Sequence, residues 1–109
     1  MGITKRELFT EEQNELAALA KALAHPARIA IISHLLNASE CINSDLVKEL
    51  GLAQATVSQH LRELKAVGII RGTIEGVSIC YCINPERWRN VQELFDQFFN
   101  QFKNSCSNC

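Results

Sequence analysis

The feature that most constrains the fold is the segment between residues 41 and 83, where a short helix, a tight turn, a longer helix and a hairpin are expected in direct succession. The short helix covers residues 45–50 and should end at Gly51, because glycine readily adopts the left-handed conformation that terminates helices. The longer helix runs from about Gln54 to Val67, with an apolar stripe spaced i, i+4, i+7 and Gly68 as its stop signal. Two helices joined by so short a turn predict a helix-turn-helix.

The outward face of the longer helix carries short polar side chains and one guanidinium group. It presents no large apolar group, and its members are Gln54, Ala55, Ser58, Gln59 and Arg62. Amides, hydroxyls and guanidinium groups form the hydrogen bonds by which proteins contact base edges and phosphates. The composition of this face therefore favours a helix that enters a DNA groove.

A hairpin is expected directly behind this helix. After Gly68 the apolar spacing changes from 3.6 residues to 2, which predicts strands over residues 69–73 and 77–83 around a turn containing Glu75 and Gly76. A hairpin in this position is typical of the wing of a winged helix.

Three segments resemble the ArsR/SmtB family of winged-helix repressors: Leu-Ala-His-Pro-Ala-Arg at residues 23–28, Ala-Gln-Ala-Thr-Val-Ser-Gln-His-Leu-Arg-Glu-Leu at 53–64, and Tyr-Cys-Ile-Asn-Pro at 81–85. The similarity covers roughly residues 10 to 102, and the order and distances of the segments make chance a poor explanation. The resemblance implies a mainly α fold with a small β-hairpin wing (α+β), a single winged helix-turn-helix domain over residues 1–109. It also implies a homodimeric repressor that leaves a double-stranded DNA operator when its ligand binds.

The residues expected to contact DNA lie on the longer helix and at the start of the wing. For His60, the resemblance implies that it orients the helix or reaches a phosphate, although a hydrogen bond between helices explains it equally well. A solvated helix face explains Lys65 equally well. The full set is Gln54, Ala55, Thr56, Ser58, Gln59, His60, Arg62, Lys65 and Arg71.

Composition agrees with a single globular domain. The chain has 109 residues, of which 47% are hydrophobic and 21% charged, and its net charge of −1 argues against binding DNA by bulk charge. The distribution matters more, because Arg62, Lys65 and Arg71 outnumber Glu63 on the expected reading surface. No stretch is long enough to span a membrane and no secretion signal is recognisable, so we expect a cytoplasmic protein without a membrane partner.

The first and last helices are expected to form the dimer interface. A capping box at Thr10 opens the first helix, and Pro26, in a favoured first position, opens a central packing helix. The last helix, residues 85–102, is unusually aromatic and would leave an apolar patch on a monomer. The family resemblance implies the same interface. The alternative is that the last helix only covers the core of its own monomer, but this would not explain the large apolar side chains of Phe99 and Phe102.

Five cysteines indicate how the repressor is controlled. Cys80 and Cys82 alternate with an apolar set, Ile79, Tyr81 and Ile83, so both thiols face outward if that set faces the core. Cys41 is expected close to these two thiols. In winged helices the segment before the helix-turn-helix, here residues 40–42, usually adds an edge strand beside the second wing strand. Three thiolates would then suit a soft ion, and we expect arsenite or a similar thiophilic ion as inducer, with no cofactor required.

This set departs from the familiar thiolate motif of the family, Cys-Val-Cys, because Cys41 is followed by Ile42 and Asn43. No histidine follows His60, which excludes a carboxylate-and-histidine zinc site on the last helix. Cys106 and Cys109 have the spacing of a metal or redox pair, but tail thiols explain them better. Oxidation or persulfide formation is a rival to metal binding, and inert surface thiols are a third alternative.

Two other classes of protein fit the sequence less well. An enzyme is not expected, because the chain has no phosphate-binding glycine loop, no serine elbow and no paired carboxylates in an apolar setting. A winged-helix interaction module that never binds DNA is the stronger rival, since a fold does not determine function. The polar face at Gln54, Ser58, Gln59 and Arg62 argues against it.

Overall fold

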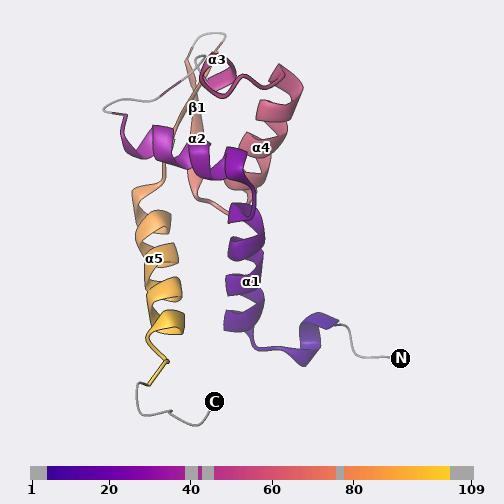
Figure 1. Ribbon diagram of the computed structural model, residues 1–109, viewed down its shortest axis with the longest axis vertical. Helices are drawn as coiled ribbons and strands as arrows, with labels where there is room; N and C mark the ends of the chain where they lie inside the picture. The colour runs from indigo at the N-terminus through magenta and orange to yellow at the C-terminus, as the bar shows by residue number, and fades with distance from the viewer. Residues whose placement is uncertain (1–4, 39–41, 43–45, 76–77, 104–109) are drawn as a thin grey trace.

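The computed structural model describes residues 5–38, 42, 46–75 and 78–103. In chain order its elements are η1 (Lys5–Leu8), α1 (Glu11–Leu23), α2 (Pro26–Leu36), α3 (Leu46–Leu50), α4 (Gln54–Ala66), β1 (Ile70–Glu75), β2 (Ser78–Ile83) and α5 (Pro85–Phe99). α1 and α5 lie side by side in one half of the molecule, while α3, α4 and the hairpin lie at the other end, beyond α2 (Figure 1).

The helix starts follow from local chemistry. The Thr10 hydroxyl accepts from the Gln13 amide N–H and the Gln13 side chain accepts from the Thr10 N–H, both at 3.0 Å, which is the predicted capping box. α2 begins at Pro26, and the ring of the preceding His25 caps it by accepting from the Ala27 N–H at 3.1 Å. The last helix ends at Phe99, three residues before the predicted end.

The helix-turn-helix is confirmed, and glycine conformations mark its boundaries. Gly51 has φ 65° after α3, and Gly68 has φ 83° after α4. Both values lie in the left-handed region, where a side chain would strain the backbone. Between these glycines the apolar stripe of α4, Val57, Leu61 and Leu64, is buried.

The wing is a two-stranded antiparallel hairpin that pairs Ile70 with Ile83 at its base. Of the predicted edge strand only Ile42 lies within the described residues, and it bridges to Tyr81 through backbone hydrogen bonds of 2.9 and 2.8 Å. Ile42 is half-buried against the core, as expected. The segment before the helix-turn-helix is therefore attached to the middle of β2.

The core lies where α1, α2, α4 and the base of the hairpin meet. Its buried members are Leu19, Ile31, Ile32, Leu35, Leu46, Val57, Leu61, Leu64, Ile69, Ile70 and Val91. α5 contributes Val91 fully and three half-buried side chains, Trp88, Leu94 and Phe95, whereas Phe98 and Phe99 near its end are exposed. Over the described residues, no single helix has the length and hydropathy of a membrane span, and α1 and α2 meet that test only jointly, with an 89° bend between them.

Candidate nucleic-acid interface

The outward face of α4 is exposed and polar, as predicted. Most of the expected DNA contacts on this helix are exposed and Ser58 is half-buried; the exposed ones are Gln54, Ala55, Thr56, Gln59, Arg62 and Lys65. The opposite face carries the buried stripe, so the core determines which side of α4 points to solvent. Arg71 is also exposed, one residue into β1.

Hydrogen bonds within α4 organise this polar face before any ligand binds. The Arg62 guanidinium donates to the Gln59 side-chain oxygen at 2.9 Å, and the Gln59 amide donates to Glu63 at 3.0 Å. The Gln54 amide donates to the Ser58 hydroxyl at 3.3 Å. These bonds join residues three or four apart, the spacing at which side chains meet on a helix. Because the face is exposed, each of these partners can be exchanged for a base or phosphate at small cost.

His60 does not belong to the exposed set, and its inclusion among the DNA contacts was wrong. Its side chain is only 6% exposed, because this position of α4 turns toward α2. The Arg28 Nε–H donates to His60 Nδ1 at 3.1 Å, and Arg28 also donates to the Ala22 carbonyl at 3.2 Å. The His25 ring lies 4.3 Å from the His60 ring. The hydrogen bond between helices is therefore the role that the structure supports.

Burial lowers the pKa of His60 below its ordinary value of 6.5, and the nearby His25 and Arg28 lower that pKa further. The folded protein consequently binds fewer protons at this position than the unfolded chain. Stability should be retained above pH 6.5 and lost as the pH falls below it toward the lowered pKa of His60.

Replacing His60 with Gln should flatten this acid loss of stability, since glutamine can accept from Arg28 but does not titrate. Urea unfolding midpoints measured from neutral pH down to about pH 5, in the window where histidine titrates, check the expectation. His34→Gln, on α2, is the matched control for the loss of a histidine side chain. An identical pH dependence in wild type and His60→Gln would contradict the assignment.

Comparisons with known proteins agree with this geometry. Residues 25–71 match the family described as bacterial regulatory protein, arsR family. The chain is 43% identical over 63 residues to the transcriptional repressor SmtB of Mycobacterium tuberculosis, a match covering 58% of this chain and 46% of SmtB, so it spans less than half of that repressor. It is 35% identical over 90 residues to the regulator NmtR of the same organism, covering 83% of this chain and 72% of NmtR.

The chain belongs to the ArsR family of transcriptional regulators. Its fold matches that of an ArsR-like regulator from Rhodococcus sp. RHA1 with a TM-score of 0.70, at 22% identity, over 84% of this chain and 86% of that one. The family resemblance and the winged helix-turn-helix are thus confirmed. Members of the family regulate transcription rather than catalyse reactions; they bind operator DNA and typically act as dimers.

The cysteines of this regulator differ in part from the prediction. Cys80 is only 4% exposed and Cys82 is half-buried, whereas Ile79, assigned to the core side, is 43% exposed. The prediction that both thiols face outward was wrong for Cys80. Tyr81 and Ile83 do pack against the core, as predicted, while Ile79 lies toward the hairpin turn, away from the buried base.

Cys80 and Cys82 nevertheless point to the same side of β2, as residues two apart on a strand must, and both are free thiols. Cys41, Cys106 and Cys109 lie outside the described residues. Among the residues that the structure does describe, no three His, Cys, Asp or Glu side chains are placed to share a metal ion.

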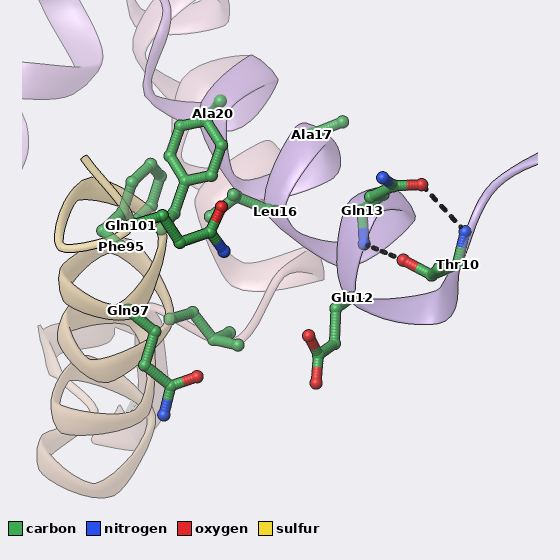
Figure 2. Close-up of a pocket in the computed structure, with 11 residues that line it drawn as sticks. Thr10, Glu12, Gln13, Leu16, Ala17, Ala20, Phe95, Gln97 and Gln101 are labelled. Carbon is green, nitrogen blue, oxygen red and sulfur yellow. Dashed lines mark hydrogen bonds between the residues drawn. The ribbon is translucent and has the colours of Figure 1, made fainter. Parts of the chain in front are cut away.

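A groove of about 600 Å³ separates α1 from α5 at the end of the molecule far from α4 (Figures 1 and 2). Apolar side chains of both helices line it, together with a polar margin; the lining residues are Thr10, Glu12, Gln13, Leu16, Ala17, Ala20, Leu94, Phe95, Gln97, Phe98 and Gln101. Phe98 in its wall is 52% exposed, and Phe99 and Phe102, which follow in the chain, are 63% and 73% exposed. This is the aromatic surface predicted from the sequence.

The sequence predicted no role for Arg28 or Arg87, each of which forms hydrogen bonds to several partners in the structure. Arg28 joins α1, α2 and α4 as described above, and Arg87 joins α1, α4 and α5. One signal was available for Arg87, which is a cation in the first turn of a helix, where the helix dipole disfavours positive charge. Such a residue needs partners from elsewhere in the fold, but the sequence does not name them.

Proposed function

We propose that this protein is a transcriptional repressor that binds operator DNA in the cytoplasm as a homodimer, with α4 of each protomer in the major groove. One observation carries the proposal: α4 buries Val57, Leu61 and Leu64 and exposes amides, a hydroxyl and the Arg62 guanidinium on its other side. These groups match the hydrogen-bonding pattern of base edges. The rival interaction module without DNA binding has no comparable use for such a face.

The α1–α5 surface supports the homodimer. Exposed phenylalanines at the end of α5 adjoin a groove with apolar walls, and Leu8 and Phe9, just before α1, are also exposed. Full burial of one such side chain stabilises an interface by about 1.5–3 kcal/mol. A symmetric pair of these surfaces would set two α4 helices at a defined separation, as two half-sites require.

Operator binding is tested by selecting duplexes from a random library with the wild-type protein and measuring affinity by fluorescence anisotropy. Gln54→Ala and Arg62→Ala should each weaken binding to the selected duplex by about 1–3 kcal/mol, the range expected for the loss of a bidentate base contact. Both side chains are exposed, so stability should change by less than about 0.5 kcal/mol.

Gln92→Ala is the control, since Gln92 is an exposed amide on α5, remote from α4. It should bind like wild type. Equal affinities in all four proteins would show that α4 does not read the DNA. A wild-type protein that selects no sequence would favour the interaction module instead.

We further propose that a thiophilic ion, arsenite in the first instance, releases the protein from DNA by binding Cys41, Cys80 and Cys82. Two observations support this. Cys80 and Cys82 share one side of β2, and Ile42, the chain neighbour of Cys41, is hydrogen-bonded to Tyr81, the chain neighbour of both other cysteines. Soft thiolates select soft metal and metalloid ions over hard cations.

The wing register supplies a route from these thiols to DNA. Cys82 is paired with Arg71 across the hairpin, so their side chains leave the same face at neighbouring positions. An ion held at Cys82 would therefore alter the surroundings of an exposed cation of the reading surface. Oxidation or persulfide formation at the same thiols is the alternative, and residues two apart on one strand suit a disulfide poorly.

A further inference from the structure

Arg87, in the first turn of α5, contacts three helical elements at once. Its Nε–H donates to the Val67 carbonyl at the C-cap of α4, at 2.9 Å. One terminal nitrogen donates to the Glu15 carboxylate on α1, also at 2.9 Å, and makes a short hydrogen bond to Asn90 on α5. The start of α5, the end of α4 and the body of α1 are thereby joined through one guanidinium group.

The end of α4 is shaped to receive this side chain. Gly68 follows Val67, and a Cβ at that position would lie 3.3 Å from Cγ of Arg87. The stem of Arg87 therefore packs on the glycine, while its Nε–H satisfies a carbonyl at the helix end. Arg87 holds the last turn of α4 by packing and by hydrogen bonding together.

Arg87 links the helices that carry two different surfaces of the protein, the aromatic groove and the polar face of α4. α1 and α5 carry the aromatic groove, and α4 carries the polar face, at opposite ends of the molecule (Figure 1). The ion pair with Glu15 is partly exposed, at 25% for Arg87 and 44% for Glu15. Partly exposed ion pairs contribute little to stability. The main effect of this pair is therefore to fix the position of Arg87 relative to Glu15.

We propose that Arg87 is a positioning residue for operator binding, which fixes the end of α4 relative to the α1–α5 pair and so sets the separation of the two reading helices in a dimer. This inference rests on the proposed function. Two helices can occupy successive major grooves only if their separation matches one helical turn of DNA. A side chain that ties the reading helix to the dimer-forming helices controls that separation without touching DNA.

The test uses the duplex selected by the wild-type protein and the same duplex with one base pair inserted between its half-sites. Arg87→Gln should bind the selected duplex about tenfold more weakly, a typical size for coupling between sites, and should discriminate less between the two duplexes. Arg87→Lys should lose the same discrimination, because a single ammonium group cannot reach Val67 and Glu15 in the fork geometry of arginine. Arg89→Gln, an exposed arginine on the same helix, is the control.

Two further measurements separate positioning from simple stabilisation. Sedimentation should give an unchanged dimer fraction for Arg87→Gln, and binding is measured well below the melting temperature of every variant. Glu15→Gln should also reduce the spacing preference, and the double variant should be no worse than Arg87→Gln alone, since both residues act through one contact.

Wild-type affinity and spacing preference in Arg87→Gln would overturn the inference, as would an affinity loss accounted for by fewer dimers. If Arg87→Gln does not fold, Glu15→Gln decides the question, and an unchanged spacing preference in that variant overturns the inference. A wild-type protein that selects no duplex would instead refute the proposed function on which the inference rests.

Discussion

Replacing Phe99 with Glu should produce monomers and abolish operator binding in the same variant. Phe99 is 63% exposed, and its ring lies 5.9 Å from Phe95 and 5.7 Å from Phe98, so it belongs to a continuous aromatic surface. A carboxylate buried at this position without a partner would cost several kcal/mol, comparable with the whole gain from burying such a surface. Each monomer would then present a single α4, which can read only one half-site.

Sedimentation velocity and anisotropy on the selected duplex check both parts of this prediction. Phe99→Leu is the matched control, because it keeps an apolar side chain and should remain a dimer that binds DNA. The fold of the glutamate variant should persist, since Phe99 is exposed and not part of the buried core. An unaltered dimer in Phe99→Glu would contradict the proposed interface.

Arsenite should release the reduced protein from its operator completely, and a variant without the three wing-region thiols should not respond. We suggest Cys41→Ser, Cys80→Ala and Cys82→Ser, with alanine at position 80 because a serine hydroxyl at a site only 4% exposed would need a hydrogen-bond partner. Release requires only that the ion bind the free conformation more tightly than the DNA-bound one.

The readout is anisotropy of the protein–DNA complex during titration, with Cys106→Ser/Cys109→Ser as the control that should still respond. Release that persists in the triple variant would move the site to Cys106 and Cys109. Release by an oxidant or persulfide donor but not by arsenite would favour the redox alternative. No release from any protein by either treatment would leave the thiols without a regulatory role.

Prediction from sequence succeeded best where the signal is local. The capping box at Thr10, the helix start at Pro26, and the helix ends at Gly51 and Gly68 all lie where the sequence indicates. Helix caps depend on a few adjacent residues, and the apolar spacing of α4 already determines which of its faces is buried. The polar face of α4 could therefore be predicted almost entirely.

Prediction failed where the environment of a side chain depends on a distant segment. His60 lies three residues after Val57 and four before Leu64, on the buried side of α4, but the sequence could not show that Arg28 and His25 enclose it. Alternation along β2 correctly put Cys80 and Cys82 on one side, but it could not show that Cys80 is buried and Ile79 exposed. A period of two assigns side chains to the two faces of a strand without saying how exposed each side chain will be.

The sequence by itself thus determined the order of the helices and most of their limits, the hairpin, the family and the polar face of α4, because periodicity, caps and turn residues are properties of neighbours in the chain. Only the tertiary structure decided that Arg28 is the partner of His60, that Cys80 is buried, and that Arg87 connects Glu15 to the end of α4. Those contacts join residues 20 and 72 positions apart. Their existence follows from how the helices pack, which no local pattern specifies.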